Sequence, residues 1–291
     1  MTLVVMATIV AVAAVLTYWH AGPAPASTKP RAQTPTTPVP SAAGSPPPQA
    51  GPGVSSGLEA EFTQLETTLH AKMGIAFSPV GSGQKATAWG DWQEGPAWST
   101  IKVPLVIAGY RQQAPPLITD TMRAAIVESD NAAAESVWAT LGDPPVAAQR
   151  VQQILQETGD PTTVESRKVR PEFTAFGQTI WSLVSQVRFT ANASCDSEND
   201  PIFNLMGQVE TDQSWGIGAV PGTQFKGGWG PSPSGKYLVR QIGVLTTPAG
   251  KVAVAIATEP ASGQFADGTQ ELGEVAKWLR GHLEALPAGH C

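Results

Sequence analysis

The chain has 291 residues, of which 42% are hydrophobic and 14% are charged, and its formal net charge is −6. This length and hydrophobic content suffice for one sizeable core, whereas the negative charge argues against a nucleic-acid partner. Residues 1–56 differ from the rest in composition, so the core is expected to lie beyond them.

Residues 1–21 are predicted to form a signal peptide or an uncleaved membrane anchor. The apolar run from Leu3 to Leu16 is near the lower length limit for a membrane-spanning helix, and residues 24–26 resemble a small-residue cleavage site. Basic residues follow this run but none precedes it, so the positive-inside rule does not support an outward-facing C-terminus. Both forms of the segment stay open, and export is inferred from the rest of the chain.

Residues 22–56 are predicted to be a linker, and residues 57–291 to be one folded domain. Proline, alanine, serine and threonine dominate the linker, and a proline-rich chain is extended and has no core of its own. The linker is therefore expected to act as a tether.

The chain contains two cysteines, Cys195 in a polar stretch and Cys291. One disulfide between them in an oxidising compartment fits this usage, and two free thiols are the alternative.

The predicted elements of the domain follow the order helix, two strands, helical region, three strands, helix. A helical stripe opens the domain with Leu58, Phe62, Leu65 and Leu69. Strands are expected at residues 73–80, 85–92, 223–230, 237–247 and 252–260. Helical signals with proline breaks fill residues 99–188, and a second amphipathic stripe at Leu272, Val275, Leu279 and Leu283 ends the domain.

Tight turns between neighbouring strands imply antiparallel pairing. Apolar stripes at both ends of the domain place the terminal helices on one face of the sheet. The predicted fold is therefore α+β, an α/β sandwich: a five-stranded antiparallel sheet, N- and C-terminal helices on one face, and a helical subdomain inserted between strands 2 and 3.

Ser99 and Lys102 are candidates for a nucleophile and its base. Residues three apart lie on the same side of a helix, so the Lys102 amine can approach the Ser99 hydroxyl. A serine needs a neighbouring base, and a desolvated lysine with a lowered pKa can be that base. The same pattern also fits a plain helix N-cap at Ser99, and it recurs by chance at Ser82 and Lys85, in a glycine turn where no helix fixes the spacing.

Ser129, Asp130 and Asn131 stand at the junction of two helical stretches. These residues are typical helix caps; in the functional interpretation Ser129 relays a proton to a leaving group and Asn131 holds a substrate carbonyl or Lys102. Further on, Lys226 precedes Gly227 and Gly228 in a predicted strand, where a ligand could approach the backbone closely. The alternative is a glycine bulge in an edge strand.

Together these residues resemble the penicillin-recognising serine hydrolases, the superfamily of class A β-lactamases and D,D-peptidases, which carry S-x-x-K, S-D-N and K-T-G in this order. The resemblance covers residues 57–286. It implies that Ser99 is acylated, that Lys102 is its base and that Ser129 relays a proton. It also implies that Asn131 and Lys226 bind substrate, and that Lys226 attracts a carboxylate group of the substrate. It also implies the β-lactamase/transpeptidase-like fold and a location outside the cytoplasmic membrane.

The sequence departs from the family pattern at three points. Gly227 replaces the threonine or serine whose hydroxyl helps to bind a β-lactam carboxylate. The interval from Ser99 to Ser129 is roughly half of that in class A enzymes, so by this comparison the helical subdomain is expected to be reduced and the site to be more open. No glutamate has the family context of the deacylating base; Glu165 and Glu172 lie in the corresponding region, where solvated charge is the alternative interpretation.

The predicted function is that of an exported serine acyl-transfer hydrolase, membrane-anchored or secreted, which acts on β-lactams or cell-wall peptides and deacylates slowly. The alternative is a catalytically degenerate member that binds cell-wall peptide or a protein partner. The partners expected are a small-molecule or peptide substrate and, if the N-terminal segment is uncleaved, the membrane; the domain is expected to be monomeric.

Other side chains with chemical potential carry weaker signals. Trp98 and Trp229 flank two motifs and either line a cleft or belong to the core. The histidines lie near the chain ends, at His20, His70, His282 and His290, so a serine–histidine–aspartate triad is poorly supported. No metal site is predicted, and no cofactor is implied.

Overall fold

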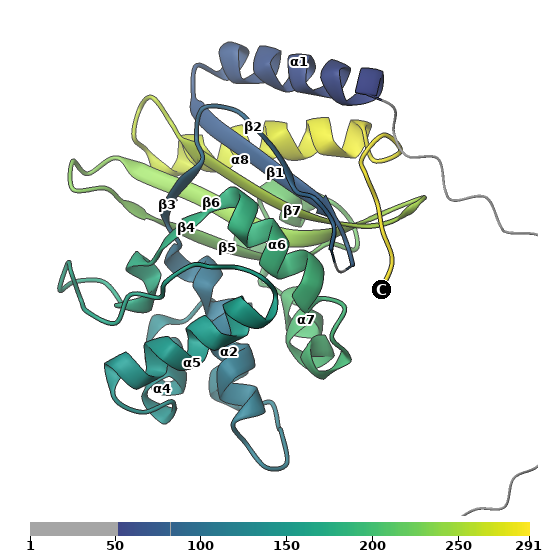
Figure 1. The fold of residues 1–291 in the computed structure, drawn as a ribbon. Coiled ribbons are helices and arrows are strands. Elements are labelled where there is room, and N and C mark those ends of the chain that lie inside the picture. Colours follow the sequence, from purple (N-terminus) through teal and green to yellow (C-terminus); the bar gives the residue numbers. More distant parts are fainter. Residues whose placement is uncertain (1–51, 82) are drawn as a thin grey trace, which may run out of the picture. The chain divides into compact units, whose positions relative to one another are not determined.

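The computed structural model describes residues 52–81 and 83–291, and Figure 1 shows a sheet with helices on both faces. The predicted signal or anchor segment and most of the linker lie outside the described residues. The first helix, α1 (Pro52–Leu69), begins before Gly57, where the domain was expected to start. None of the described helices has the length and apolarity needed to cross a bilayer.

The central sheet confirms the predicted five antiparallel strands. They are β1 (Lys72–Pro79), β2 (Thr87–Trp89), β5 (Gln224–Pro231), β6 (Tyr237–Thr247) and β7 (Gly250–Glu259). Their order across the sheet is β2-β1-β7-β6-β5, so β5 is an edge strand.

The two faces of the sheet bury side chains of different size. Along β7 the larger side chains pack toward α1 and the C-terminal helix α8 (Phe265–Gly281), and these are Val252, Val254 and Ile256. The alternate positions face α6 (Leu183–Ala193), and these are Ala253, Ala255 and Ala257. Because side chains alternate along a strand, this pattern lets α6 approach the sheet closely while α1 and α8 cover the opposite face together (Figure 1).

The predicted helical insertion between β2 and β5 is present. Besides α6, its helices are α2 (Lys102–Arg111), α3 (Asp120–Val127), α4 (Asn131–Thr140), α5 (Pro144–Glu157) and α7 (Asp200–Met206). The insertion also contains β4 (Ile180–Ser182), which pairs with β3 (Glu94–Pro96) ahead of α2. These three-residue strands were not predicted, because so short a segment shows no alternating pattern.

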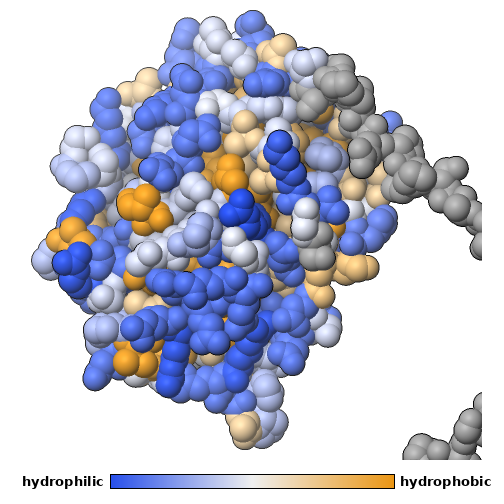
Figure 2. All heavy atoms as spheres, in the orientation of Figure 1, coloured by the Kyte–Doolittle hydropathy of each residue, from blue (hydrophilic) through white to orange (hydrophobic). Residues whose placement is uncertain are grey.

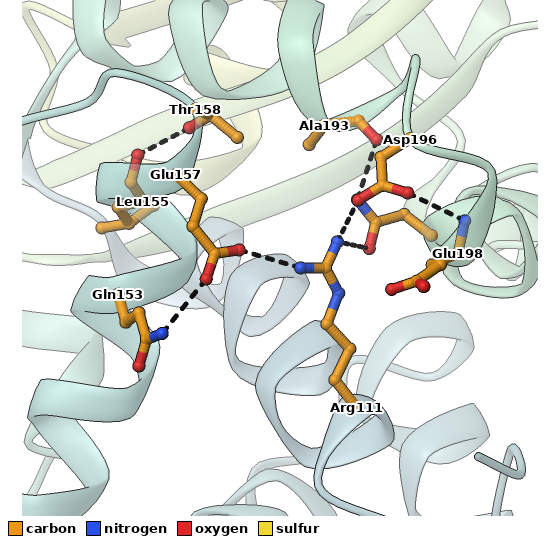
Figure 3. A network of polar contacts seen from close by, with 9 residues as sticks. Arg111, Gln153, Leu155, Glu157, Thr158, Ala193, Asp196 and Glu198 are labelled. Carbon is orange, nitrogen blue, oxygen red and sulfur yellow. Dashed lines mark hydrogen bonds and ion pairs between the residues drawn. The ribbon is translucent and has the colours of Figure 1, made fainter. Parts of the chain in front are cut away.

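Arg111 joins three parts of the insertion (Figure 3). It stands at the end of α2 and donates to Glu157 of α5 over 2.9 Å and to Asn199 over 2.8 Å. It also pairs with Asp196. Helices from both ends of the insertion are thereby tied to one guanidinium group, and the surface over these helices is largely hydrophilic (Figure 2).

Cys195 and Cys291 form a disulfide, which confirms that prediction. Their Cα atoms lie 5.1 Å apart, within the usual range for such a bond. The bridge fixes the C-terminal residue to the segment after α6. Because disulfides persist in oxidising surroundings, it also favours an extracytoplasmic location.

Candidate active site

Ser99 lies in a short 3-10 turn, η1 (Trp98–Ile101), that leads directly into α2. Lys102 is the first residue of α2, and its backbone N–H donates to the Ser99 carbonyl. In a 3-10 turn, residues three apart in sequence lie above one another, so the side chains of Ser99 and Lys102 project from the same side of the turn. Pro104 falls in the first turn of α2, where a backbone N–H has no partner within that helix. The proline therefore does not interrupt the helix.

Ser129 lies between α3 and α4 with φ of 58°, a left-handed conformation that costs a non-glycine residue on the order of 1–2 kcal/mol. In this conformation both its carbonyl and its hydroxyl contact lysine amines. Lys102 Nζ donates to the Ser129 carbonyl over 2.5 Å and to Asn131 Oδ1 over 2.7 Å. Lys226 Nζ donates to Ser129 Oγ over 2.7 Å. Two lysines that are far apart in sequence therefore meet at one serine.

The glycines after Lys226 allow β5 to lie against the nucleophile turn. A Cβ atom on Gly228 would stand 2.8 Å from the Ser99 backbone nitrogen and 2.9 Å from that of Thr100. Both distances are too short for a side chain, so only glycine permits this approach. The motif lies in the edge strand β5, and the backbone of this strand lies beside Ser99.

Burial changes the acid–base properties of both lysines. It lowers the pKa of Lys102 to about 7, while the nearby Asp130 carboxylate acts in the opposite direction. Burial also holds the pKa of Lys226 well below its ordinary value, and the positive charge of Lys102 lowers it further. A lysine with a pKa near neutrality can accept a proton at physiological pH.

Ser99 opens onto a cleft of about 420 Å³. The cleft is lined by residues of η1, α4, the loop after α5, and the β5–β6 hairpin: Trp98, Ser99, Asn131, Ala132, Glu135, Lys168, Glu172, Phe173, Thr174, Trp229, Gly230, Pro231 and Tyr237. Trp98 and Trp229 thus both line it. Trp98 is nonetheless buried, because its ring packs over Gly230 and against Phe173.

The two glutamates considered from the sequence differ in position. Glu172 lines the cleft and pairs with Arg170 at 3.1 Å. Glu165 does not line it; hydrogen bonds from Arg167 hold its carboxylate and lower its pKa. Sequence reasoning missed Glu135, which lines the cleft and pairs with Lys168 at 3.1 Å. Its spacing of four residues from Asn131 on one helix was a usable signal.

Arg240 is a second residue that sequence reasoning missed. Its guanidinium is fully buried and donates to the carbonyls of Gly95, Pro96 and Trp181 over 2.9 Å each. It also donates to Gln186, whose amide in turn donates to the Thr100 hydroxyl beside Ser99. Arg240 therefore fixes the backbone of β3 just ahead of η1 and, through Gln186, contacts the Thr100 side chain within η1. An arginine in a strand gives no signal of such contacts until the chain is folded.

The other candidate residues that the structure describes do not line the cleft. Ser82 is outside the described residues, and its partner Lys85 is exposed between β1 and β2. His20 also lies outside them, and no described histidine lines the cleft. In the described part of the chain, no group of three or more His, Cys, Asp or Glu residues could hold a metal ion.

The sheet order and the helical insertion identify the fold. The fold is that of the penicillin-recognising serine hydrolases, in the form found in class A β-lactamases. No protein-family model matches the chain, and no curated protein matches it in sequence.

Solved structures show the likeness directly. The extended-spectrum β-lactamase TLA-3 superposes with a TM-score of 0.63 at 15% identity, over 78% of this chain and 98% of that one. A class A β-lactamase from Mycobacterium abscessus gives 0.60 at 15% identity, over 78% and 99%. A β-lactamase from Streptosporangium roseum gives 0.60 at 16% identity, over 79% and 100%. At these identities the likeness establishes the fold alone.

Proposed function

We propose that this protein is a serine acyl-transfer hydrolase that works through an acyl-enzyme on Ser99. One observation carries the proposal: two buried lysine amines converge on Ser129, and one of them belongs to Lys102, which stands one turn after a serine that opens onto a cleft. Burying two amines with like charge is costly unless at least one of them is neutral. A neutral amine next to a serine is the arrangement needed to activate a nucleophile.

In the proposed reaction each of these residues has a role in a particular step. Lys102 accepts the Ser99 proton while Ser99 Oγ bonds to the substrate carbonyl carbon. The bond to the leaving group then breaks, and the leaving group receives a proton through Ser129, whose hydroxyl contacts both lysine amines. Water finally cleaves the Ser99 ester, which releases the acid and restores the serine hydroxyl.

Deacylation is proposed to be the slow stage. A positioned general base typically contributes 10²- to 10⁴-fold in rate. The two carboxylates that line the cleft, Glu135 and Glu172, are each held by a cation of the loop after α5. The ester should therefore be long-lived, whether the acyl donor is a β-lactam or a cell-wall peptide, the donors that the family likeness favours.

We also propose that the protein works outside the cytoplasm, either secreted or held by its N-terminal segment. The Cys195–Cys291 disulfide supports this location, and cell-wall peptides are found there.

A non-catalytic binding function is the second candidate. It is favoured by the bonding of Lys102 Nζ, which donates to Ser129 and Asn131 rather than to Ser99. In a binder, the same cleft would hold a cell-wall peptide or a protein segment without forming an ester.

Covalent labelling separates the two candidates. A fluorophosphonate should attach one label to the protein, at Ser99, and raise its intact mass by that of the label. Ser99→Ala should abolish this attachment. Equal labelling of wild type and Ser99→Ala, or labelling of neither, would refute the acyl-enzyme and leave the binder. Lys102→Ala should slow this labelling far more than Lys85→Ala. Lys85→Ala is the matched control, because Lys85 belongs to the second S-x-x-K sequence and is exposed.

A further inference from the structure

Four half-buried aromatic side chains form a cluster at the β5 edge of the sheet, hereafter the β5 aromatic cluster: Trp215, Trp229, Tyr237 and Phe265. The ring centroids of Trp229 and Phe265 lie 5.2 Å apart, and Trp215 is 6.0 Å from Trp229. Tyr237 is 6.0 Å from Phe265. Trp229 and Tyr237 also line the Ser99 cleft, so the cluster extends the cleft with an aromatic wall.

Trp215 occupies the space beside Gly227. A Cβ atom on Gly227 would lie 3.2 Å from two carbons of the Trp215 indole and 3.7 Å from Trp229. A threonine at this position would therefore meet an aromatic ring. The hydroxyl expected from the third motif is absent, and apolar surface lies next to the place it would take.

Gln241 fixes Trp215 in that place. Its buried amide donates to the Trp215 carbonyl over 2.8 Å and accepts from the Ile217 N–H over 2.8 Å. Gly216 between them has φ of 54°, a conformation that favours glycine. Gln241 therefore holds the backbone on both sides of Gly216, and the Trp215 indole extends from this fixed backbone to the position beside Gly227.

The charges around the cleft are unfavourable for an anionic substrate. Among the described residues that line it, Lys168 is the one cation, and it is paired with Glu135. Glu172 adds a second carboxylate. Lys226 is fully buried and its amine donates to Ser129 and to the Gly227 carbonyl. An incoming carboxylate would meet no unpaired cation at the surface of this cleft.

We propose that the site takes neutral acyl donors, whose leaving group is an uncharged aromatic or similarly flat apolar group that packs against the β5 aromatic cluster. This inference rests on the proposed function, because it names the substrate class of the same site. Packing such a group on Trp229 and Tyr237 removes apolar surface from water and gains ring–ring contact. The carboxylate-binding role expected of Lys226 is then replaced by apolar contact.

A matched pair of esters tests the proposal. The phenyl ester of N-acetylglycine and its meta-carboxyphenyl counterpart share the acyl group and differ by one carboxylate on the leaving ring. We expect kcat/KM to be at least about tenfold higher for the neutral ester. Trp229→Ala and Trp215→Ala should lower that value about tenfold, mainly through KM, and leave the carboxylate ester nearly unchanged.

Trp278→Ala is the control variant, since Trp278 is also half-buried against other aromatic rings but belongs neither to the cleft lining nor to the β5 aromatic cluster. Trp229→Phe, which keeps a ring, should retain most of the preference and guards against a folding defect in the alanine variants. Fluorophosphonate labelling of Ser99 accompanies each measurement.

The outcomes are distinguishable. Two results would overturn the substrate inference alone, provided that Ser99 is labelled. One is a higher kcat/KM for the carboxylate ester. The other is a loss of kcat/KM in Trp229→Ala and Trp215→Ala that is no larger than the loss in Trp278→Ala. No label on wild-type Ser99 would overturn the acyl-enzyme and the substrate inference with it. Finally, Trp215→Ala combined with Gly227→Thr should move the preference toward the carboxylate ester, and no movement would also count against the inference.

Discussion

The lowered pKa of Lys102 makes the pH dependence of Ser99 acylation a sharp test of the site. Only neutral Lys102 can accept the Ser99 proton, and its pKa is about 7. The neutral fraction falls tenfold for each pH unit below the pKa, so the labelling rate should drop about 100-fold between pH 8 and pH 5. Above about pH 8 it should be nearly constant.

The assay is the second-order rate constant of fluorophosphonate labelling, followed by intact mass from pH 5 to pH 10. Lys102→Arg keeps a cation but removes the base, and it should slow labelling at pH 8 by about 10²- to 10⁴-fold. A rate that still climbs tenfold per unit up to pH 10 would refute the reasoning, because it would indicate a lysine near its ordinary pKa of 10.5.

The burial of Lys102 should also make the free energy of unfolding depend on pH. Its pKa is lower in the folded than in the unfolded chain, so the unfolded chain binds more protons between about pH 7 and 10.5. The free energy of unfolding therefore rises with pH in this window, by at most about 1.4 kcal/mol per pH unit for this one group. Urea denaturation at pH 7 and pH 9 should show a smaller rise in Lys102→Met, and an equal rise would contradict the burial argument.

Three further outcomes are expected. Gly228→Ala should slow Ser99 labelling at least about tenfold, because the added methyl group meets backbone atoms of η1, whereas Gly273→Ala, which meets nothing, should leave the rate unchanged. Arg240→Met should lower the free energy of unfolding by about 3 to 5 kcal/mol, since it leaves buried carbonyls unpaired; a loss below about 1 kcal/mol in urea denaturation would dismiss its positioning role. Reduction of the Cys195–Cys291 disulfide should cost about 2 to 5 kcal/mol in the same assay, and an unchanged midpoint with reductant would show that the bridge adds no stability.

The sequence alone determined the features that depend on local patterns. Alternating apolar residues and tight turns identified the five strands, and apolar stripes with steps of three and four residues identified the two terminal helices. Three short motifs placed Ser99, Lys102, Ser129 and Lys226 as candidates, because each motif holds its residues at a spacing that local structure preserves. Two cysteines were enough to predict their pairing.

Tertiary structure decided what depends on contacts between distant segments. That Lys102 and Lys226 meet at Ser129 follows from the packing of α2, the α3–α4 junction and β5, and no pattern within any one of them records it. Arg240 reads in sequence as an ordinary strand residue, and only the fold surrounds it with acceptors. Trp215 likewise gives no signal in the sequence; only in the folded chain does Gln241 bind its backbone carbonyl while its ring lies beside Gly227. Local spacing determines which side chains share one face of a helix or strand. The burial and the hydrogen-bond partners of a side chain are decided only when separate elements pack together, and these in turn set its pKa and its contribution to specificity.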